Sequence, residues 1–249
     1  MDWQAVLRQL EQGVLRAAEP NKQGVWQANI MVKEAILSAF KAGYLVEYGA
    51  PYQRFVDKHN IPPRQFSVED KVRLVPGGSS VRSGAYVAPG VVIMPPAYVN
   101  IGAYIDIGTM VDSNVLVGSC AQVGQHVHLS AGVQIGGVLE PVGLAPVVID
   151  DHVFVGAGAV VLEGIMVRKY AVIAPGVTLS KAVPVYDCVK QEVRPRGAEI
   201  PECAVVVAGT RPINSEWGQA QGLAINCPLI IKYRDNKTDA SLVFEEALR

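Results

Sequence analysis

The stretch VNIGAYIDIGTMVDSNVLVGSCAQVGQHVHLSAGVQI (residues 99–135) decides the fold, because a branched or aliphatic side chain returns at every sixth position. The same step of six extends to both sides of this stretch, with one break at residues 139–146. Four residues after most of these positions stands a small or apolar residue, such as Ala103. The positions in the series are Val75, Val81, Val87, Ile93, Val99, Ile105, Val111, Val117, Val123, Leu129, Ile135, Ile149, Val155, Val161, Val167, Ile173 and Leu179.

A period of six fits neither an α-helix, which repeats every 3.6 residues, nor a strand that alternates throughout. It fits a triangular coil in which each hexad forms one short strand and one corner. Three hexads then complete a turn of about 18 residues, and successive turns stack as parallel strands about 4.8 Å apart. The β-branched residue points into the narrow interior. The sequence therefore predicts a mainly-β protein built on a parallel β-helix of five to six turns.

Composition supports this prediction and excludes several classes of protein. Valine is concentrated between residues 72 and 207, which hold 31 of the 39 valines, and residues 75–140 contain four charged side chains. The formal net charge of -1 and the absence of a basic cluster argue against a nucleic-acid partner. No apolar run approaches the roughly 18–20 residues of a membrane span, and the polar start MDWQAVLRQLEQ is not typical of a signal peptide. Four scattered cysteines favour a cytoplasmic protein with reduced thiols.

Three domains are expected: an N-terminal helical domain at 1–70, the β-helix at 71–184, and a C-terminal segment at 185–249. Apolar residues at helical spacing predict helices within 3–15 and 27–40, and Gly43 stands where the second should end. The C-terminal segment is expected to contain a loop, strands at 204–209 and 228–233, and a short helix at 238–249.

Charges inside the repeat are rare enough to be candidates for chemistry. Asp106 and Asp112 each follow an inward aliphatic residue, so they should point outward from two adjacent faces of one turn. Ser130 lies 18 residues after Asp112 and should stack one turn above it. A carboxylate at Asp112 can accept a proton from an amine nucleophile. A plain corner or solvent contact is the alternative interpretation.

Other candidates each carry a structural alternative. The glycines of SAGVQIGGVLEP (130–141) can present backbone N–H groups to an oxyanion or a cofactor, or can simply adapt a corner to a loop. Arg73 and Arg82 can clamp carboxylates or lie solvated. His126 and His128 should alternate within one strand and face opposite sides, which disfavours a histidine-ligated metal. Cys120 is expected to be a small buried thiol.

Long motifs resemble one known family. VNIGAYIDIGTMVD (99–112), GSCAQVGQHVHLSAGVQIGGVLEP (118–141) and AVVVAGTRP (204–212) are similar to the tetrahydrodipicolinate N-succinyltransferases, which are hexapeptide-repeat acyltransferases. The resemblance covers nearly the whole chain. It implies left-handed β-helices assembled as a homotrimer, with sites between subunits, and an activity in lysine and diaminopimelate synthesis. It also implies that the amine of 2-amino-6-oxopimelate attacks an acyl-CoA thioester directly, without an acyl-enzyme or a metal.

The resemblance assigns roles to particular residues. Asp112 matches the family's catalytic aspartate, Arg73 its substrate-binding arginine, and Ser130 is expected beside Asp112 in the substrate site. The chain departs from the family at GAGAVVLEG (156–164), where succinyltransferases commonly carry an arginine and a glutamate in place of Gly158 and Val160. This segment resembles the tetrahydrodipicolinate N-acetyltransferases instead, so succinyl-CoA and acetyl-CoA both remain as donors. The residues expected to bind the acyl-CoA are Gly136, Gly137, Gly158, Ala174 and Lys181.

Three alternatives to that assignment stay open. The chain can be a paralogue that uses acetyl-CoA in secondary metabolism on a related amino diacid. It can be a non-catalytic trimeric scaffold, which the loss of the glutamate at Val160 would favour and the presence of Asp112 and Arg73 disfavours. A carbonic anhydrase-like metalloenzyme is the third alternative, and the spacing of His126 and His128 disfavours it.

Overall fold

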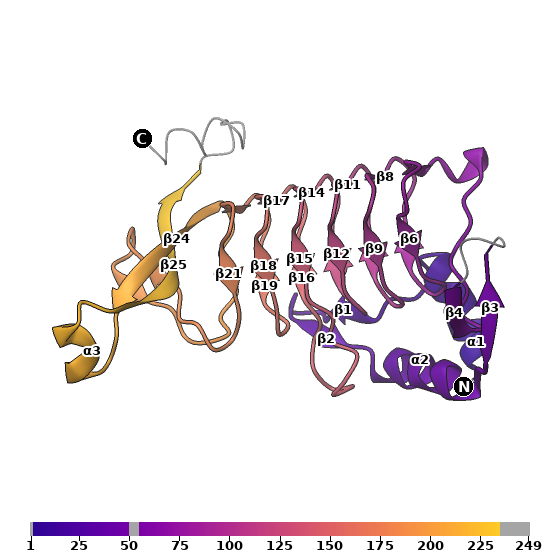
Figure 1. Cartoon of the computed structure of the whole chain (residues 1–249), viewed down its shortest axis with the longest axis horizontal. Helices are drawn as coiled ribbons and strands as arrows, with labels where there is room; N and C mark the ends of the chain where they lie inside the picture. The colour runs from indigo at the N-terminus through magenta and orange to yellow at the C-terminus, as the bar shows by residue number, and fades with distance from the viewer. Residues whose placement is uncertain (1, 50–54, 235–249) are drawn as a thin grey trace.

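Each hexad of the repeat forms one two-residue strand and one corner, as the spacing predicts. The computed structural model describes residues 2–49 and 55–234. The hexad strands build three parallel sheets, which we call sheets I, II and III in the order in which the chain visits them. Together they form a left-handed parallel β-helix, whose stacked turns fill the middle of Figure 1.

Register is constant through most of the coil, because equivalent residues of successive turns lie 18 apart. The second residue of every strand from β6 to β21 is buried, which confirms sixteen of the seventeen predicted interior positions. Sheet I contains β5 (Arg73–Leu74), β8 (Val92–Ile93), β11 (Met110–Val111), β14 (His128–Leu129), β17 (Phe154–Val155) and β20 (Val172–Ile173); sheet II contains β6 (Ser80–Val81), β9 (Tyr98–Val99), β12 (Leu116–Val117), β15 (Gln134–Ile135), β18 (Val160–Val161) and β21 (Thr178–Leu179); sheet III contains β7 (Tyr86–Val87), β10 (Tyr104–Ile105), β13 (Gln122–Val123), β16 (Val148–Ile149) and β19 (Met166–Val167).

The prediction for Val75 is wrong by one residue. Leu74, not Val75, pairs opposite Ile93 and packs against the core. The step from Leu74 to the next interior position, Val81, is therefore seven residues instead of six. Gly77 and Gly78, both with positive φ, lie in this longer connection. Counting by hexads cannot detect an extra residue that falls in a corner.

The break in the repeat is an insertion. Val123 pairs with Ile149, so this turn takes 26 residues, eight more than the others. The additional residues form a loop between β15 and β16, and we call residues 138–146 the insertion loop.

The N-terminal segment is more mixed than the predicted helical domain. α1 (Trp3–Glu11) and α2 (Ile30–Ala42) are accompanied by two hairpins and followed by a 3-10 helix, η1. The second helix begins later than predicted, because the Asn29 side chain accepts the Val32 N–H as its N-cap. It ends at Gly43, as predicted. The remaining bounds are β1 (Ala18–Pro20), β2 (Trp26–Ala28), β3 (Leu45–Tyr48), β4 (Phe55–Lys58) and η1 (Val68–Asp70).

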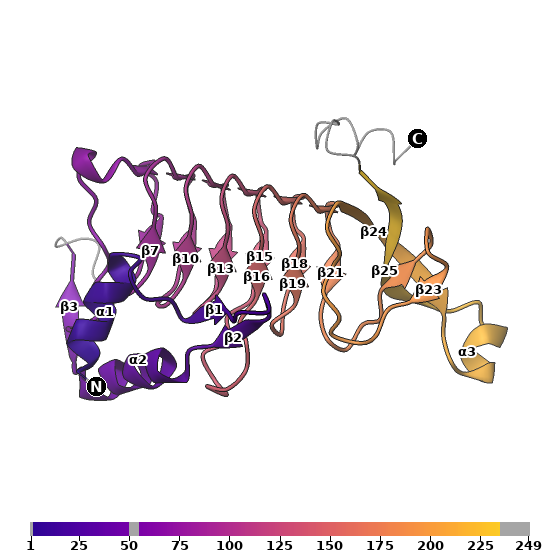
Figure 2. The ribbon, with the colours of Figure 1, turned by 180° about the vertical axis from the view of Figure 1, so that it is seen from behind.

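This segment packs on one side of the first turns (Figures 1 and 2). Leu7 and Ile36 share a buried cluster with Cys120, which confirms the expectation of a buried thiol there. Arg16 lies 3.6 Å from the centre of the Tyr104 ring and donates from Nε to Gln122 Oε1 at 2.8 Å. We call residues 2–49 the N-terminal cap. It covers the outer face of sheet III, whereas the outer faces of sheets I and II lie on the other two sides of the coil.

At the far end the chain adds a long hairpin. β24 (Ala204–Pro212) pairs with β20 in sheet I, and β25 (Ala224–Tyr233) returns beside it, so both predicted strands are present and longer than predicted. The short helix α3 (Glu216–Ala220) lies at the tip of this hairpin (Figure 1). The small strands β22 (Tyr186–Asp187) and β23 (Glu192–Val193) complete sheet I. The predicted helix at 238–249 lies outside the described residues, and the domain division 1–70, 71–184 and 185–249 stays a prediction.

Candidate active site

Asp112 and Ser130 lie one above the other at the corner between sheets I and II, as predicted. The Asp112 N–H donates to Leu129 O and the Ser130 N–H to Val155 O, each at 2.9 Å, which places the two residues at equivalent points of successive turns. The Asp112 Oδ1 accepts the Ser113 N–H at 2.7 Å, and this bond orients the carboxylate. Asp112 is half-buried, so its second oxygen remains available to a ligand.

His128 is the titratable neighbour of Asp112, and the sequence did not single it out as such. It lies in β14 directly opposite Met110 and stacks on Phe154, with ring centroids 5.1 Å apart. Burial lowers the pKa of His128, and the charge of Asp112 opposes that shift. An imidazole whose charged form is disfavoured by burial therefore lies near a carboxyl group at this edge of sheet I. The spacing of 18 residues places His128 one turn above Met110, two residues from the column of Asp112, and that signal was available in the sequence.

A strip of glycines runs along the same corner. Gly132, Gly158 and Gly176 occupy equivalent positions in three successive turns, with φ between 67° and 74°. A Cβ at Gly158 or Gly176 would meet no atom within 4 Å, so the space beside the strip is open. Ala174 lies two residues before Gly176, in the column of Asp112 and Ser130. The glycine strip thus begins one turn above Asp112, whose own turn carries Asn114 at the equivalent position with φ of 62°.

Gly136, Gly137 and Lys181 lie at a different corner, the one between sheets II and III. They line a cavity of about 650 Å³ whose wall is completed by the insertion loop and the following turn. Gly137 has no room for a side chain, because a Cβ there would stand 2.5 Å from the Ser119 nitrogen. The cavity is lined by Gly136, Gly137, Val138, Glu140, Leu144, Leu162, Glu163, Lys181 and Ala182.

The predicted site residues therefore form two groups. Asp112, Ser130, Gly158 and Ala174 share one edge of sheet II, and the cavity with Gly136, Gly137 and Lys181 lies along its other edge. The period of six predicts this separation, because Gly136 follows Asp112 by 24 residues. That interval is one full turn of 18 residues plus one face of six.

Arg73 belongs to neither group. It begins sheet I as an exposed residue of β5, two turns from Met110 and about 10 Å away at the spacing of stacked strands.

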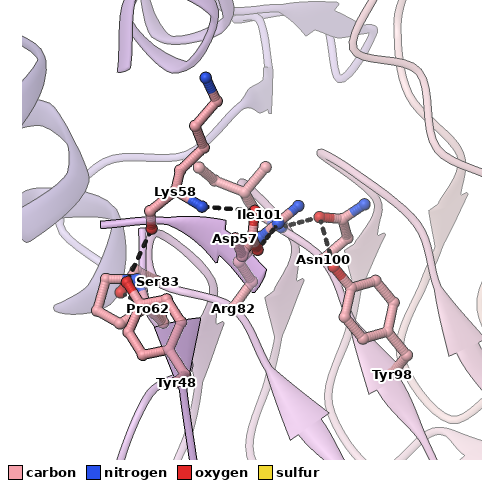
Figure 3. A network of polar contacts seen from close by, with 9 residues as sticks. All are labelled: Tyr48, Asp57, Lys58, Pro62, Arg82, Ser83, Tyr98, Asn100 and Ile101. Carbon is pink, nitrogen blue, oxygen red and sulfur yellow. Dashed lines mark hydrogen bonds and ion pairs between the residues drawn. The ribbon is translucent and has the colours of Figure 1, made fainter. Parts of the chain in front are cut away.

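Arg82, the other candidate clamp, is engaged within the chain. Its guanidinium binds the Asp57 carboxylate, which also accepts the Lys58 N–H at 2.8 Å (Figure 3). Tyr48 donates to Lys58 O at 2.9 Å, so the network fastens the β3–β4 hairpin to the first turn of the coil. Burial alone would raise the pKa of Asp57, but the bonds from Lys58 and Arg82 outweigh it and lower the pKa overall. Arg82 is therefore a structural clamp on Asp57.

The expectation that His126 and His128 alternate within one strand is wrong. His126 lies outside β14, at a corner with φ of 51°, and stacks on His152 with centroids 5.3 Å apart. His152 in turn stacks on Tyr170 at 4.9 Å. Among the described residues, no group of three or more His, Cys, Asp or Glu side chains is arranged to hold a metal ion. Within 2–49 and 55–234 no helix is long and apolar enough to cross a membrane.

The coil, the corner carboxylate and the separate cavity together define the class: a left-handed β-helix of the acyltransferase type. Residues 3–42 match the model of the tetrahydrodipicolinate N-succinyltransferase N-terminal domain. A 2,3,4,5-tetrahydropyridine-2,6-dicarboxylate N-succinyltransferase of Paraburkholderia phymatum is 42% identical over 98% of this chain and 86% of its own length. One from Afipia carboxidovorans is 39% identical over 96% and 86%. The chain belongs to the tetrahydrodipicolinate N-succinyltransferase family and is an enzyme of this type.

Two further comparisons add a sequence relative and a structure of the same fold. Protein TabB of Pseudomonas amygdali pv. tabaci is 47% identical over 98% of this chain and 87% of its own, a higher identity than the two succinyltransferases above. The crystal structure of a Campylobacter jejuni protein described as a 2,3,4,5-tetrahydropyridine-2-carboxylate N-succinyltransferase aligns with a TM-score of 0.60 at 17% identity. That alignment covers 90% of this chain and 61% of the other, and it supports the fold.

Proposed function

We propose that this protein is an acyl-CoA-dependent N-acyltransferase that acts on the amine of tetrahydrodipicolinate, in its ring-opened 2-amino-6-oxopimelate form, or of a close analogue. The amine nitrogen attacks the thioester carbonyl, a C–N bond forms, and the C–S bond breaks. The proton leaves the nitrogen for the Asp112 carboxylate and is passed to the departing thiolate, so the products are the amide and free CoA.

The observation that carries this proposal is the position of Asp112. The corner segments 94–97, 112–115, 130–133, 156–159 and 174–177 contain one charged residue among them, and that residue is Asp112. Its carboxylate is oriented by the Ser113 N–H, and the glycine strip begins one turn above it. A positioned carboxylate of this kind can serve as general base. Arg73 and Ser130 are proposed to bind the amino diacid.

The cavity along the other edge of sheet II is proposed as the acyl-CoA site. Its walls combine apolar side chains such as Leu144 and Leu162 with the charged residues Glu163 and Lys181. That mixture fits a long co-substrate with amide and apolar parts. Gly158 and Val160 supply no charged group for a second carboxylate on the donor, so acetyl-CoA is proposed beside succinyl-CoA.

A homotrimer with sites between subunits is part of the proposal. In one chain, sheet II lies between Asp112 and the cavity, and this separation supports a site that a second copy completes. Apposing the Asp112 corner of one copy to the cavity of its neighbour completes a site. Closed symmetry then gives every copy the same two roles.

The test is thiol release with tetrahydrodipicolinate or 2-aminopimelate as acceptor, comparing succinyl-CoA with acetyl-CoA. Asp112→Asn should lower kcat by about 10²-fold or more, the range that a general base contributes. Asp106→Asn is the matched control, because Asp106 also follows an inward aliphatic residue and its Oδ1 accepts the next N–H, at 2.8 Å. This control should retain nearly full activity.

Two results would overturn the proposal. Asp112→Asn with the activity of the parent protein would remove Asp112 as the base. Absence of thiol release with both donors would restore the scaffold interpretation.

A further inference from the structure

The insertion loop has two sides with different neighbours. On one side Val138, Glu140 and Leu144 line the cavity proposed for acyl-CoA. On the other side Leu139 packs against the buried cluster of the N-terminal cap. The loop therefore lies between the cap and the cavity and forms part of the cavity wall.

Lys33 of α2 makes a polar contact with this loop. Its side chain is fully buried, and its ammonium donates to Leu144 O at 2.6 Å. Lysine is rarely buried completely, because an ammonium loses its hydration there. Lys33 lies one helical turn before Ile36, so it shares the face of α2 that packs on the coil. The charge is thus placed where a loop carbonyl needs a donor.

Other contacts hold the ends of the loop but not its middle. The Val138 N–H donates to Ser119 O at 3.0 Å, and Gly164 leaves space for Ala145 O. Between them the Leu144 N–H closes a turn on Pro141 O at 3.1 Å. The bond from Lys33 attaches this turn to the cap. The same bond restrains Leu144, because the carbonyl of Leu144 is the acceptor. The Leu144 side chain lines the cavity, so the bond links Lys33 to the cavity wall.

We propose that Lys33 is a positioning residue for the acyl donor, fixing Leu144 and the insertion loop over the CoA chain. The inference rests on the proposed function of the cavity. Lys33 touches neither the donor nor the amine. Its loss should weaken donor binding and leave the chemistry at Asp112 unchanged.

The test compares Lys33→Met with Lys41→Met in the full-length protein. Methionine keeps most of the buried stem and removes the donor N–H groups, whereas Lys41 is an exposed residue of the same helix. In Lys33→Met the Kd for free CoA, by calorimetry, and the KM for acyl-CoA should rise about fivefold to thirtyfold, the effect of losing one charge-assisted hydrogen bond. The kcat and the KM for the amine should stay within about twofold, since general-base chemistry is untouched. Amide hydrogen exchange in residues 139–146 should become faster.

The outcomes separate this inference from the proposed function. A parent protein that transfers the acyl group, with unchanged Kd and exchange in Lys33→Met, would overturn the role of Lys33 and leave the function standing. A parent protein that releases no thiol, with weaker CoA binding and faster loop exchange in Lys33→Met, would refute the proposed acyl transfer and support the role of Lys33. If Lys33→Met does not fold, Leu144→Ala decides, because it keeps the carbonyl that binds Lys33 and removes the exposed side chain that Lys33 is proposed to hold over the donor. Unchanged CoA affinity in that variant would refute the inference.

Discussion

Replacing Gly102 by alanine tests both the corner geometry and the packing of the cap. Gly102 has φ of 75°, a left-handed conformation that costs a residue with a side chain about 1–2 kcal/mol. Its Cβ would also stand 2.9 Å from Cys120 Sγ and 3.0 Å from Ile36 Cδ1, inside the buried cluster. Overpacking of a core costs about 1–3 kcal/mol. We expect Gly102→Ala to lower the free energy of unfolding by about 2–5 kcal/mol, the sum of both terms.

Gly176→Ala isolates the backbone term. Gly176 has φ of 70° at the open corner, and its Cβ would meet no atom within 4 Å, so about 1–2 kcal/mol is expected. Both variants are measured by urea unfolding at one protein concentration, since association would add a concentration-dependent contribution. Equal losses in the two variants would refute the overlap with the cap, and no loss in Gly176→Ala would refute the left-handed corner.

Two further predictions follow from titratable groups. Burial and a 2.5 Å hydrogen bond to Asp187 raise the pKa of Tyr233 from 10.0 to about 12. The protonated phenol therefore contributes its full share of the folding stability below pH 10.0, and this contribution is lost as the pH rises through about 12. In Tyr233→Phe, the free energy of unfolding measured with urea should fall less between pH 10 and 12 than in the parent protein. An unchanged pH profile would contradict this prediction. Burial raises the pKa of Cys120 to about 12, whereas Cys188 is exposed. A thiol-reactive dye should therefore label Cys188 first in the native protein; Cys188→Ser should abolish the fast phase, and rapid labelling of Cys120 would contradict its burial.

The interior of the coil could be predicted because the narrow interior accepts one branched or aliphatic side chain from each hexad, always at the same position. Ile105 and Leu129 are fully buried at the positions that the period assigns. Val75 fails because a corner can absorb an extra residue without disturbing the strands on either side. The β1 and β2 strands were missed because three residues carry no measurable alternation. Their pairing depends on Arg16 and Trp26 lying over sheet III, which is a tertiary contact.

The candidate site was predictable in its residues and less so in its arrangement. Asp112 stands out because charge is scarce around it, and the 18-residue step to Ser130 places the two together. Grouping Gly136 with Gly158 and Ala174 overlooked that Gly136 lies at the next corner of the coil, one face further along the chain. Lys33 was missed because a lysine on a helix usually indicates a solvated face, although its spacing from Ile36 places it on the buried one.

The three corners share one backbone conformation and differ in what covers it. At the corner between sheets II and III, Cys120 adopts positive φ beneath the N-terminal cap. At the corner between sheets III and I, His126, His152 and Tyr170 do so and stack their rings. Side chains are thus tolerated at these positions despite a cost of about 1–2 kcal/mol each. The need for positive φ therefore does not by itself explain why the corner beside Asp112 carries glycine in three successive turns. The bare backbone begins one turn above Asp112, the one charged residue of that corner, and the room that it leaves for a substrate is the physical argument for our proposal that the reaction takes place at Asp112.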